Sequence, residues 1–186
     1  MRIIGGKFKG KKLNQVKLVT TRPLKDVVKE SIFNVLAHSK DIFLEFGNSK
    51  VLDLYSGTGS FGIECISRGS NKVTFVEKNE NAFSVIKKNL STLQVGDKAE
   101  LINDSVENYL LDNREKKFNI FFFDPPYSDK SFLKNLKLLR SKKIFLKDHI
   151  IIIHRESKIS ENFNEEMKVL KIKTYGRSKI FFGIFY

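Results

Sequence analysis

Cysteine, histidine and tryptophan are scarce in this chain. Its 186 residues include one cysteine, three histidines and no tryptophan. The single thiol of Cys65 cannot form an intramolecular disulfide, and no neighbouring residue suggests activation, so we expect it in the core. The histidines stand at positions 38, 149 and 154, without the spacing of metal ligands. We therefore predict no disulfide and no metal site.

Long apolar runs are also absent. No stretch reaches the roughly 18–20 uninterrupted apolar residues that a membrane-spanning helix needs. Residues 1–7 lack the apolar region of a signal peptide, and we see neither internal repeats nor a low-complexity linker. With 41% hydrophobic residues the chain can build one packed core. We expect a cytoplasmic protein with no membrane contact.

Acidic residues are missing from the first seventeen positions, which are strongly basic. The whole chain has 34 Lys and Arg against 21 Asp and Glu, a net charge of +13 that favours a polyanionic partner such as nucleic acid. Its richness in Lys, Ile, Asn and Phe is the bias of an AT-rich genome, so the placement of charge is better evidence than its total. We predict a basic arm over residues 1–19 that contacts phosphates; a solubilising tail is the alternative.

Apolar periodicity predicts strands that alternate with helices. A first helix is expected after a start signal at residues 20–23, with Lys25, Lys29 and Glu30 on its exposed face. Such alternation gives a parallel sheet built from βαβ units, and a terminal hairpin with its turn at 176–178 adds an antiparallel strand. The expected strands are 51–54, 72–76, 99–102, 118–123, 149–153, 167–175 and 179–185; the helices between them are 60–68, 79–93, 105–111 and 131–139.

Asp124, Pro125, Pro126 and Tyr127 directly follow the apolar run 118–123. Successive prolines cannot continue a helix or a central ladder, so we expect their carbonyls to point outward as acceptors. The amino group of a flat base can then donate to Asp124 and to a prolyl carbonyl, while Tyr127 stacks on the ring. An ordinary Pro-Pro turn is the alternative.

A glycine-rich turn follows the first of the alternating strands. Gly57, Gly59 and Gly62 match G-x-G-x-x-G, and Glu77 ends the next strand, where an acid can bind a ribose. Taken alone, this fingerprint fits a nicotinamide dinucleotide or S-adenosylmethionine. Asp53 favours the latter, because a carboxylate in the leading strand would repel a pyrophosphate but can hold the methionyl ammonium, directly or through water.

Two further strand ends support that choice. Asn103 and Asp104 end the third strand and supply an acceptor for an adenine amino group, and Asp124 ends the fourth. The carboxyl ends of parallel strands share one edge of the sheet, where open α/β sheets bind ligands. We therefore predict one cofactor and acceptor site at that edge.

These motifs together resemble the class I S-adenosylmethionine-dependent methyltransferases with an Asp-Pro-Pro-Tyr motif. Residues 2–13, residues 22–36 and the hairpin at Tyr175-Gly176 are similar to the RsmD family, which methylates the N2 amino group of one guanine in 16S ribosomal RNA. Tyr55-Ser56 replaces the more usual Phe-Ala, and Lys replaces Arg at many basic positions. The resemblance implies an α/β, Rossmann-like fold with a mostly parallel seven-stranded sheet and an antiparallel C-terminal hairpin strand, in a single domain over residues 20–186.

The resemblance also implies an activity and the residues that carry it. A monomer would transfer a methyl group from S-adenosyl-L-methionine to a guanine of 16S rRNA, in the small ribosomal subunit or an assembly intermediate. His154 is expected to have no role. The implied catalytic residues are Asp124, Pro125, Pro126 and Tyr127; the cofactor residues are Asp53, Tyr55, Ser56, Gly57, Thr58, Gly59, Glu77, Asp104 and Ser105; the RNA-binding residues are Arg2, Lys7, Lys9, Lys11, Lys12, Arg22, Lys25 and Lys29.

Three alternatives stay open. A DNA adenine-N6 methyltransferase would use the same turn and the same amino-group chemistry, but it needs a target-recognition region for which little chain is left. A non-catalytic RNA-binding or ribosome assembly protein would not need an intact Asp124 and Glu77. A nicotinamide-dependent reductase would bind a dinucleotide.

Overall fold

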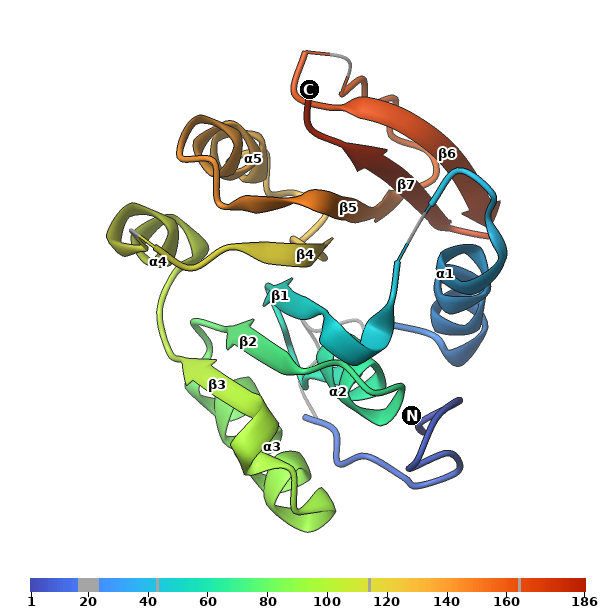
Figure 1. Ribbon diagram of the computed structural model, residues 1–186, viewed down its shortest axis with the longest axis vertical. Helices are drawn as coiled ribbons and strands as arrows, with labels where there is room; N and C mark the ends of the chain where they lie inside the picture. Colours follow the sequence, from blue (N-terminus) through green and yellow to red (C-terminus); the bar gives the residue numbers. More distant parts are fainter. Residues whose placement is uncertain (17–23, 43, 114, 164) are drawn as a thin grey trace.

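One mixed sheet organises the part of the chain that the computed structural model describes, residues 1–16, 24–42, 44–113, 115–163 and 165–186. Within it the sheet has seven strands in the order β3-β2-β1-β4-β5-β7-β6 (Figure 1). The first five pair in parallel, and β7 runs antiparallel between β5 and β6, so the predicted sheet is confirmed. The strands are β1 (Lys50–Leu54), β2 (Lys72–Val76), β3 (Ala99–Ile102), β4 (Phe118–Phe123), β5 (Phe145–Glu156), β6 (Lys168–Tyr175) and β7 (Ser178–Ile184).

Helices cover both faces of the sheet (Figure 1). On one face lie α1 (Asp26–His38), α2 (Ser60–Ser67) and α3 (Glu80–Leu93); on the other lie α4 (Val106–Asp112) and α5 (Phe132–Ser141). Short 3-10 helices, η1 (Phe46–Asn48) and η2 (Gly96–Lys98), precede β1 and β3. Burial on both faces is what makes the central strands nearly continuous apolar runs. Among the described residues, no helix is both long and apolar enough to cross a membrane.

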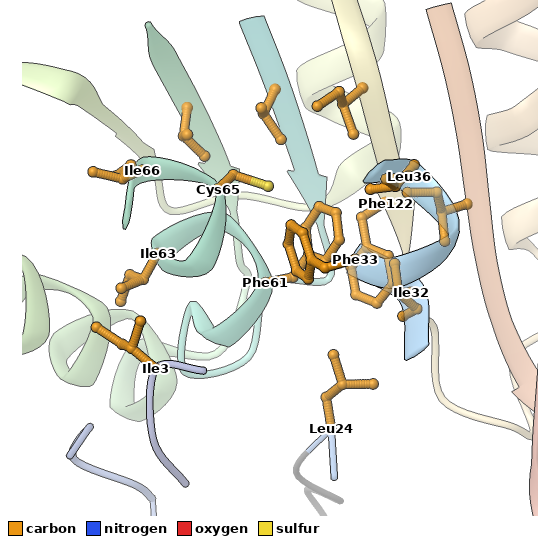
Figure 2. Close-up of a cluster of buried hydrophobic side chains, with 14 of the residues drawn as sticks. Ile3, Leu24, Ile32, Phe33, Leu36, Phe61, Ile63, Cys65, Ile66 and Phe122 are labelled. Atoms are coloured by element: carbon orange, nitrogen blue, oxygen red, sulfur yellow. The ribbon is translucent and has the colours of Figure 1, made fainter. Parts of the chain in front are cut away.

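Aromatic rings fill the core beneath α1 and α2. The ring of Phe61 stacks between Phe33, at 5.2 Å, and Phe122, at 4.1 Å, and so joins α2 to α1 and β4 (Figure 2). Cys65 lies in this core, fully buried, and burial raises the pKa of its thiol well above the ordinary value. The expectation that it is a core residue is confirmed.

The predicted elements from β1 onward all form. The boundaries of β5, and those of α1 before β1, differ from the predicted ones. β5 begins at Phe145 and ends at Glu156, so it extends past both ends of the apolar run that predicted it. α1 begins at Asp26 after an extended Lys25, whose side chain forms no capping bond. The predicted start signal lies outside the described residues, and Leu24 and Lys25, which follow it, are not helical.

Residues 1–13 form a hairpin that packs on the domain, and we call them the N-terminal hairpin. The amide of Ile3 donates to the Lys11 carbonyl at 2.9 Å, and the amide of Lys7 donates to the Ser67 carbonyl of α2 at 2.7 Å. Ile3 and Leu13 are buried in the core, with 0% and 6% exposed. The basic side chains of the hairpin remain exposed, so its contact with RNA stays a prediction.

A buried ion pair connects this hairpin to α1 and α2. Lys29 and Glu64 are both 0% exposed, and their charged atoms lie 3.6 Å apart. The Lys29 ammonium also donates to the Arg2 carbonyl at 2.7 Å and to the Ser60 hydroxyl at 3.2 Å. Burial lowers the pKa of Lys29, while the Glu64 and Asp26 carboxylates oppose that shift. The expectation that Lys29 is exposed and binds phosphate is therefore wrong: Glu64, distant in sequence, draws it inward.

We expect Lys29→Ala to destabilise the protein by about 3–5 kcal/mol, because it removes one of the two cations that face the buried Glu64 and leaves only Arg68. Urea unfolding measures the change. Lys25→Ala, at an exposed position directly before the same helix, is the control and should stay within about 0.5 kcal/mol. A loss below about 1 kcal/mol for Lys29→Ala would show that Arg68 and the Ile4 amide, which also bond to Glu64, compensate its charge alone.

Candidate active site

The carboxyl ends of β1, β4 and β5 lie side by side. Leu54 of β1 pairs with Phe123 of β4, which pairs with Ile153 of β5. The next residues along β4 and β5 are Asp124 and His154, which therefore emerge together at one edge of the sheet. The glycine turn after β1 lies at the same edge, so the structure brings the predicted cofactor turn and the acceptor loop together.

The three glycines of the turn are required for two different reasons. Gly57 and Gly59 have φ angles of +56° and +79°, in the left-handed region that favours glycine. A Cβ at Gly62 would lie 2.3 Å from the ring of Phe75, so this glycine permits α2 to pack closely on β2. A Cβ at Gly57 would meet no atom within 4 Å, so the outer side of the turn is open.

Tyr55 and Ser56 hold the turn in place. Tyr55 has a φ of +58°, which is strained for a residue other than glycine, and its hydroxyl accepts from the Asn135 amide at 2.9 Å. Burial raises the pKa of Tyr55 to about 12. The Ser56 hydroxyl donates to the carbonyls of Asp53, at 2.6 Å, and of Val76, at 3.2 Å, and thus ties β1 to β2.

Glu77, at the end of β2, closes the turn from the opposite side. Its carboxylate accepts from the amide of Gly57 at 2.7 Å and from the amide of Asn79 at 2.8 Å. A carboxylate has about four acceptor positions, so ribose hydroxyls can bind beside these two bonds. The Thr58 carbonyl accepts from the buried Asn89 of α3 at 3.2 Å, which fixes the third side of the turn.

Asp104 and Ser105 stand at the end of β3. One oxygen of Asp104 accepts from the Ser105 amide at 2.6 Å and from the Asn108 side chain at 2.9 Å. The Ser105 hydroxyl caps α4 by accepting from the Asn108 amide at 3.1 Å. Both of these Asp104 bonds fall on Oδ1, so its other oxygen is the candidate acceptor for an adenine amino group.

Asp53 is the most deeply buried carboxylate of the site. Only 1% of it is exposed, and it accepts from the Gly62 amide at the start of α2, at 2.9 Å. Burial raises its pKa well above the ordinary value, with smaller contributions in the same direction from Asp124 and Glu77. This acid fixes the helix to the strand at a cost in stability, and its contact with a methionyl ammonium stays a prediction.

A histidine that sequence reasoning set aside contacts the acceptor loop. Nδ1 of His154 lies 2.8 Å from Asp124 Oδ1, and its Nε2 lies 3.4 Å from the Tyr127 hydroxyl. His154 is 6% exposed. A signal was available: His154 follows the apolar run of β5, at the level where β4 gives way to Asp124. His154, expected to have no role, thus contacts two of the predicted site residues.

A buried arginine holds the loop from the other side. Arg155 is 1% exposed, and its guanidinium donates to the carbonyls of Pro126 at 3.1 Å and Tyr127 at 3.0 Å. The Pro126 carbonyl also accepts from the Asp129 amide at 2.9 Å, so both its acceptor positions are used. The prediction that the prolyl carbonyls point outward is therefore wrong for Pro126. The Pro125 carbonyl also accepts from Arg155, at 3.5 Å, and Pro125 is buried, so a contact of this carbonyl with a substrate stays a prediction.

The charge of Arg155 is compensated without using Asp124. Glu161 accepts from Arg155 Nε at 2.7 Å, and the guanidinium lies 4.4 Å from the centre of the Phe132 ring. Nothing in the sequence around residue 155 identified this role, because its partners in the loop are about 30 positions away.

The predicted RNA-binding residues are divided by the structure. Lys29 is buried, and Arg22 lies outside the described residues. The exposed members are Arg2, Lys7, Lys9, Lys11, Lys12 and Lys25. Within the described ranges, no group of three His, Cys, Asp or Glu residues could hold a metal ion.

A depression of about 610 Å³ lies elsewhere, between α1 and β6. It is lined in part by Ser31, Asn34, Lys171, Lys173 and Tyr175. None of the predicted catalytic or cofactor residues lines it. The candidate site is therefore defined by the convergence of strand ends and not by the depth of a pocket.

Comparisons with known proteins agree with this geometry. A family model described as Conserved hypothetical protein 95 matches residues 1–184. Ribosomal RNA small subunit methyltransferase D of Buchnera aphidicola is 35% identical over 158 residues, covering 85% of this chain and 79% of that protein. The protein of the same name from Haemophilus influenzae is 33% identical over 178 residues, covering 95% and 89%. The solved structure of Escherichia coli yhhF, whose description assigns it to the methyltransferases, has a TM-score of 0.81 at 27% identity and covers 98% and 96% of the two chains.

We expect Asp53→Asn to stabilise the protein at neutral pH, because burial raises the pKa of Asp53 and makes its ionised form costly in the folded state. The folded protein raises the pKa of Asp53, so below the ordinary value of 3.8 the acid is protonated in both states and costs nothing. As the pH rises above that value, ionisation favours the unfolded chain. Asparagine keeps an acceptor for the Gly62 amide and removes this loss.

Urea unfolding between pH 4 and 8 tests the sign. The gain of Asp53→Asn should shrink toward zero at the acid end, while the exposed Asp97→Asn should show no such trend. If Asp53→Asn is less stable than the parent at pH 7, the claim that the ionised Asp53 destabilises the folded protein is wrong.

Proposed function

The chain belongs to the RsmD family of methyltransferases, and from that premise we propose that it transfers a methyl group from S-adenosylmethionine to the N2 amino group of a guanine in 16S ribosomal RNA. One observation carries the proposal: the Asp124–Tyr127 loop follows the strand that pairs with the strand leading into the glycine turn. The loop proposed to bind the base and the turn proposed to bind the cofactor thus follow neighbouring strands.

The donor set at this edge fits S-adenosylmethionine. Glu77 offers carboxylate oxygens for the ribose hydroxyls, and Asp104 offers one for the adenine amino group. The open side of Gly57 permits close approach of a ligand to the backbone. Asp53 lies beneath the turn, where its negative charge would be offset by the methionyl ammonium. When bound, the cofactor supplies a methyl group on a sulfonium sulfur.

Asp124 makes the guanine amine a better nucleophile. The lone pair of N2 is delocalised into the ring, so the free amine attacks poorly. Hydrogen bonds from N2–H to Asp124 and to the Pro125 carbonyl favour a pyramidal nitrogen and stabilise the positive charge that develops there. The new N–C bond would form as the bond from the methyl carbon to sulfur breaks, and N2 becomes acidic only then. Asp124, already bonded to N2–H, can accept that proton, so no strong base is needed beforehand.

Tyr127 would stack on a guanine taken out of the RNA stack, as enzymes that act on a base generally require. The exposed basic side chains of the N-terminal hairpin would hold the surrounding phosphates. The names of the relatives favour small-subunit ribosomal RNA as the substrate over DNA.

We expect Asp124→Ala to lower methyl transfer at least about 100-fold, the usual effect of removing one preorganised polar group. Cofactor affinity should change little, because the proposed cofactor contacts come from the turn, Glu77 and Asp104. The test uses radiolabelled S-adenosylmethionine and small subunits that lack the modification, followed by identification of the labelled nucleoside. Asp148→Asn, exposed at the opposite end of β5, is the control.

Label in N2-methylguanosine supports the proposal. A parallel reaction offers DNA instead of small subunits. Label in N6-methyladenine of that DNA would contradict the proposal that ribosomal RNA is the substrate. Binding of S-adenosylmethionine without transfer to either would favour the non-catalytic assembly protein. Unchanged turnover in Asp124→Ala would remove the carboxylate from the mechanism.

We expect Lys9→Glu with Lys11→Glu to weaken RNA binding and flatten its salt dependence. The slope of log K should fall by about 0.7–0.9 for each phosphate that the protein no longer neutralises. Filter binding over a range of salt concentrations measures both quantities. Lys117→Glu with Lys134→Glu makes the same change of charge away from the hairpin. If both pairs weaken binding equally, net charge and not the hairpin governs affinity.

A further inference from the structure

His154 is a buried polar group beside the acceptor loop to which the proposed mechanism gives no task. It lies on the same face of the sheet as Asp124, one strand away, and contacts both Asp124 and Tyr127. We propose that His154 is a positioning residue that presents the carboxylate of Asp124 and the ring of Tyr127 to the base. This inference rests on the proposed function of the site.

The partners determine which nitrogen carries the proton. The Asp124 carboxylate only accepts hydrogen bonds, so Nδ1 of His154 donates to it across 2.8 Å. Its Nε2 faces the Tyr127 hydroxyl at 3.4 Å. The three side chains thus form one chain of polar contacts that runs from Tyr127 through His154 to Asp124.

This chain of bonds selects one oxygen of Asp124 for the substrate. Oδ1 is held by the imidazole, and 23% of the Asp124 side chain is exposed against 7% of the His154 side chain. Oδ2 is therefore left to meet the amino group from the open side.

The nearest cation does not take over this task. Arg155 follows His154 in the same strand and so points to the opposite face of the sheet. Its guanidinium is already engaged by Glu161 and by the carbonyls of the loop. A lysine or arginine in the place of His154 would form an ion pair with Asp124 and weaken it as an acceptor.

The contact with Tyr127 sets the direction of its ring. The two rings are 5.9 Å apart at 80°, and the phenol reaches the imidazole through its hydroxyl. The bond therefore fixes the tip of the side chain without stacking the imidazole on the phenol. A Tyr127 ring that is fixed before the base binds loses less conformational freedom on binding. We therefore expect this bond to affect the affinity for RNA more than the rate of methyl transfer.

Three substitutions separate the two bonds. His154→Asn keeps a donor near the position of Nδ1, His154→Gln places an amide near Nε2, and His154→Phe keeps a ring but removes both bonds. We expect His154→Phe to lower kcat by up to about 100-fold, the effect of misplacing a reacting group by about 1 Å, and to raise KM for RNA several-fold. Asn should restore mainly kcat, and Gln mainly KM. Affinity for S-adenosylmethionine should stay the same in all three.

His149 is the matched control. It lies in the same strand, half-buried, but bonds to the Phe185 amide and the Leu146 carbonyl at the other end. His149→Phe should lower the unfolding temperature and leave kcat and KM of the folded enzyme unchanged. Three His154 variants that lose activity only in proportion to their stability, or a fully active His154→Phe, would overturn the inference. A parent enzyme that forms no N2-methylguanosine would overturn the proposed function instead.

Discussion

The parallel pairing of β1 with β4 is the constraint on which the site depends. Adjacent strands lie about 4.8 Å apart, so the register of Leu54 with Phe123 decides that the glycine turn and the acceptor loop begin side by side. Both strands are buried on both faces, and a slip by one residue would turn every side chain to the wrong face. The apolar core therefore does more than stabilise the fold: it fixes the distance between the glycine turn after β1 and the acceptor loop after β4.

Stability is lost at this edge and recovered elsewhere. Asp53 carries a charge that its surroundings disfavour, and Tyr55 occupies a backbone conformation that suits glycine better. Strain and buried charge of this kind persist where surrounding structure holds them, which here means the stacked rings below α2 and the ion pair of Lys29 with Glu64. That ion pair reaches the first residue of α2 through Ser60, so the hairpin and the cofactor turn share one support.

Local sequence patterns predicted the elements well and their long-range partners poorly. Strands such as β2 and β4 are largely apolar runs, and their bounds follow from that alone. Lys29 is different: it lies at helical spacing from the buried Ile32 and Phe33, but its charge predicted exposure, and the partner Glu64 that compensates this charge is distant in sequence. The parts played by His154 and Arg155 depend on a strand pairing that joins positions about 30 apart, and no short window of sequence contains both partners. The residues proposed to touch a ligand were predictable from motifs, whereas the residues that hold them were not.

The acceptor loop explains why such support is needed. Two successive prolines remove two backbone donors, so the loop cannot form a ladder and leaves carbonyls that require partners. Consecutive residues of β5 meet this need from opposite faces: Arg155 binds the carbonyls from one side, and His154 holds the Asp124 side chain on the other. An isolated Asp-Pro-Pro-Tyr segment would present its carboxylate in many directions. Beside β5, the Asp124 carboxylate is held by His154 and the loop carbonyls are held by Arg155, so the direction of both is fixed by residues outside the motif.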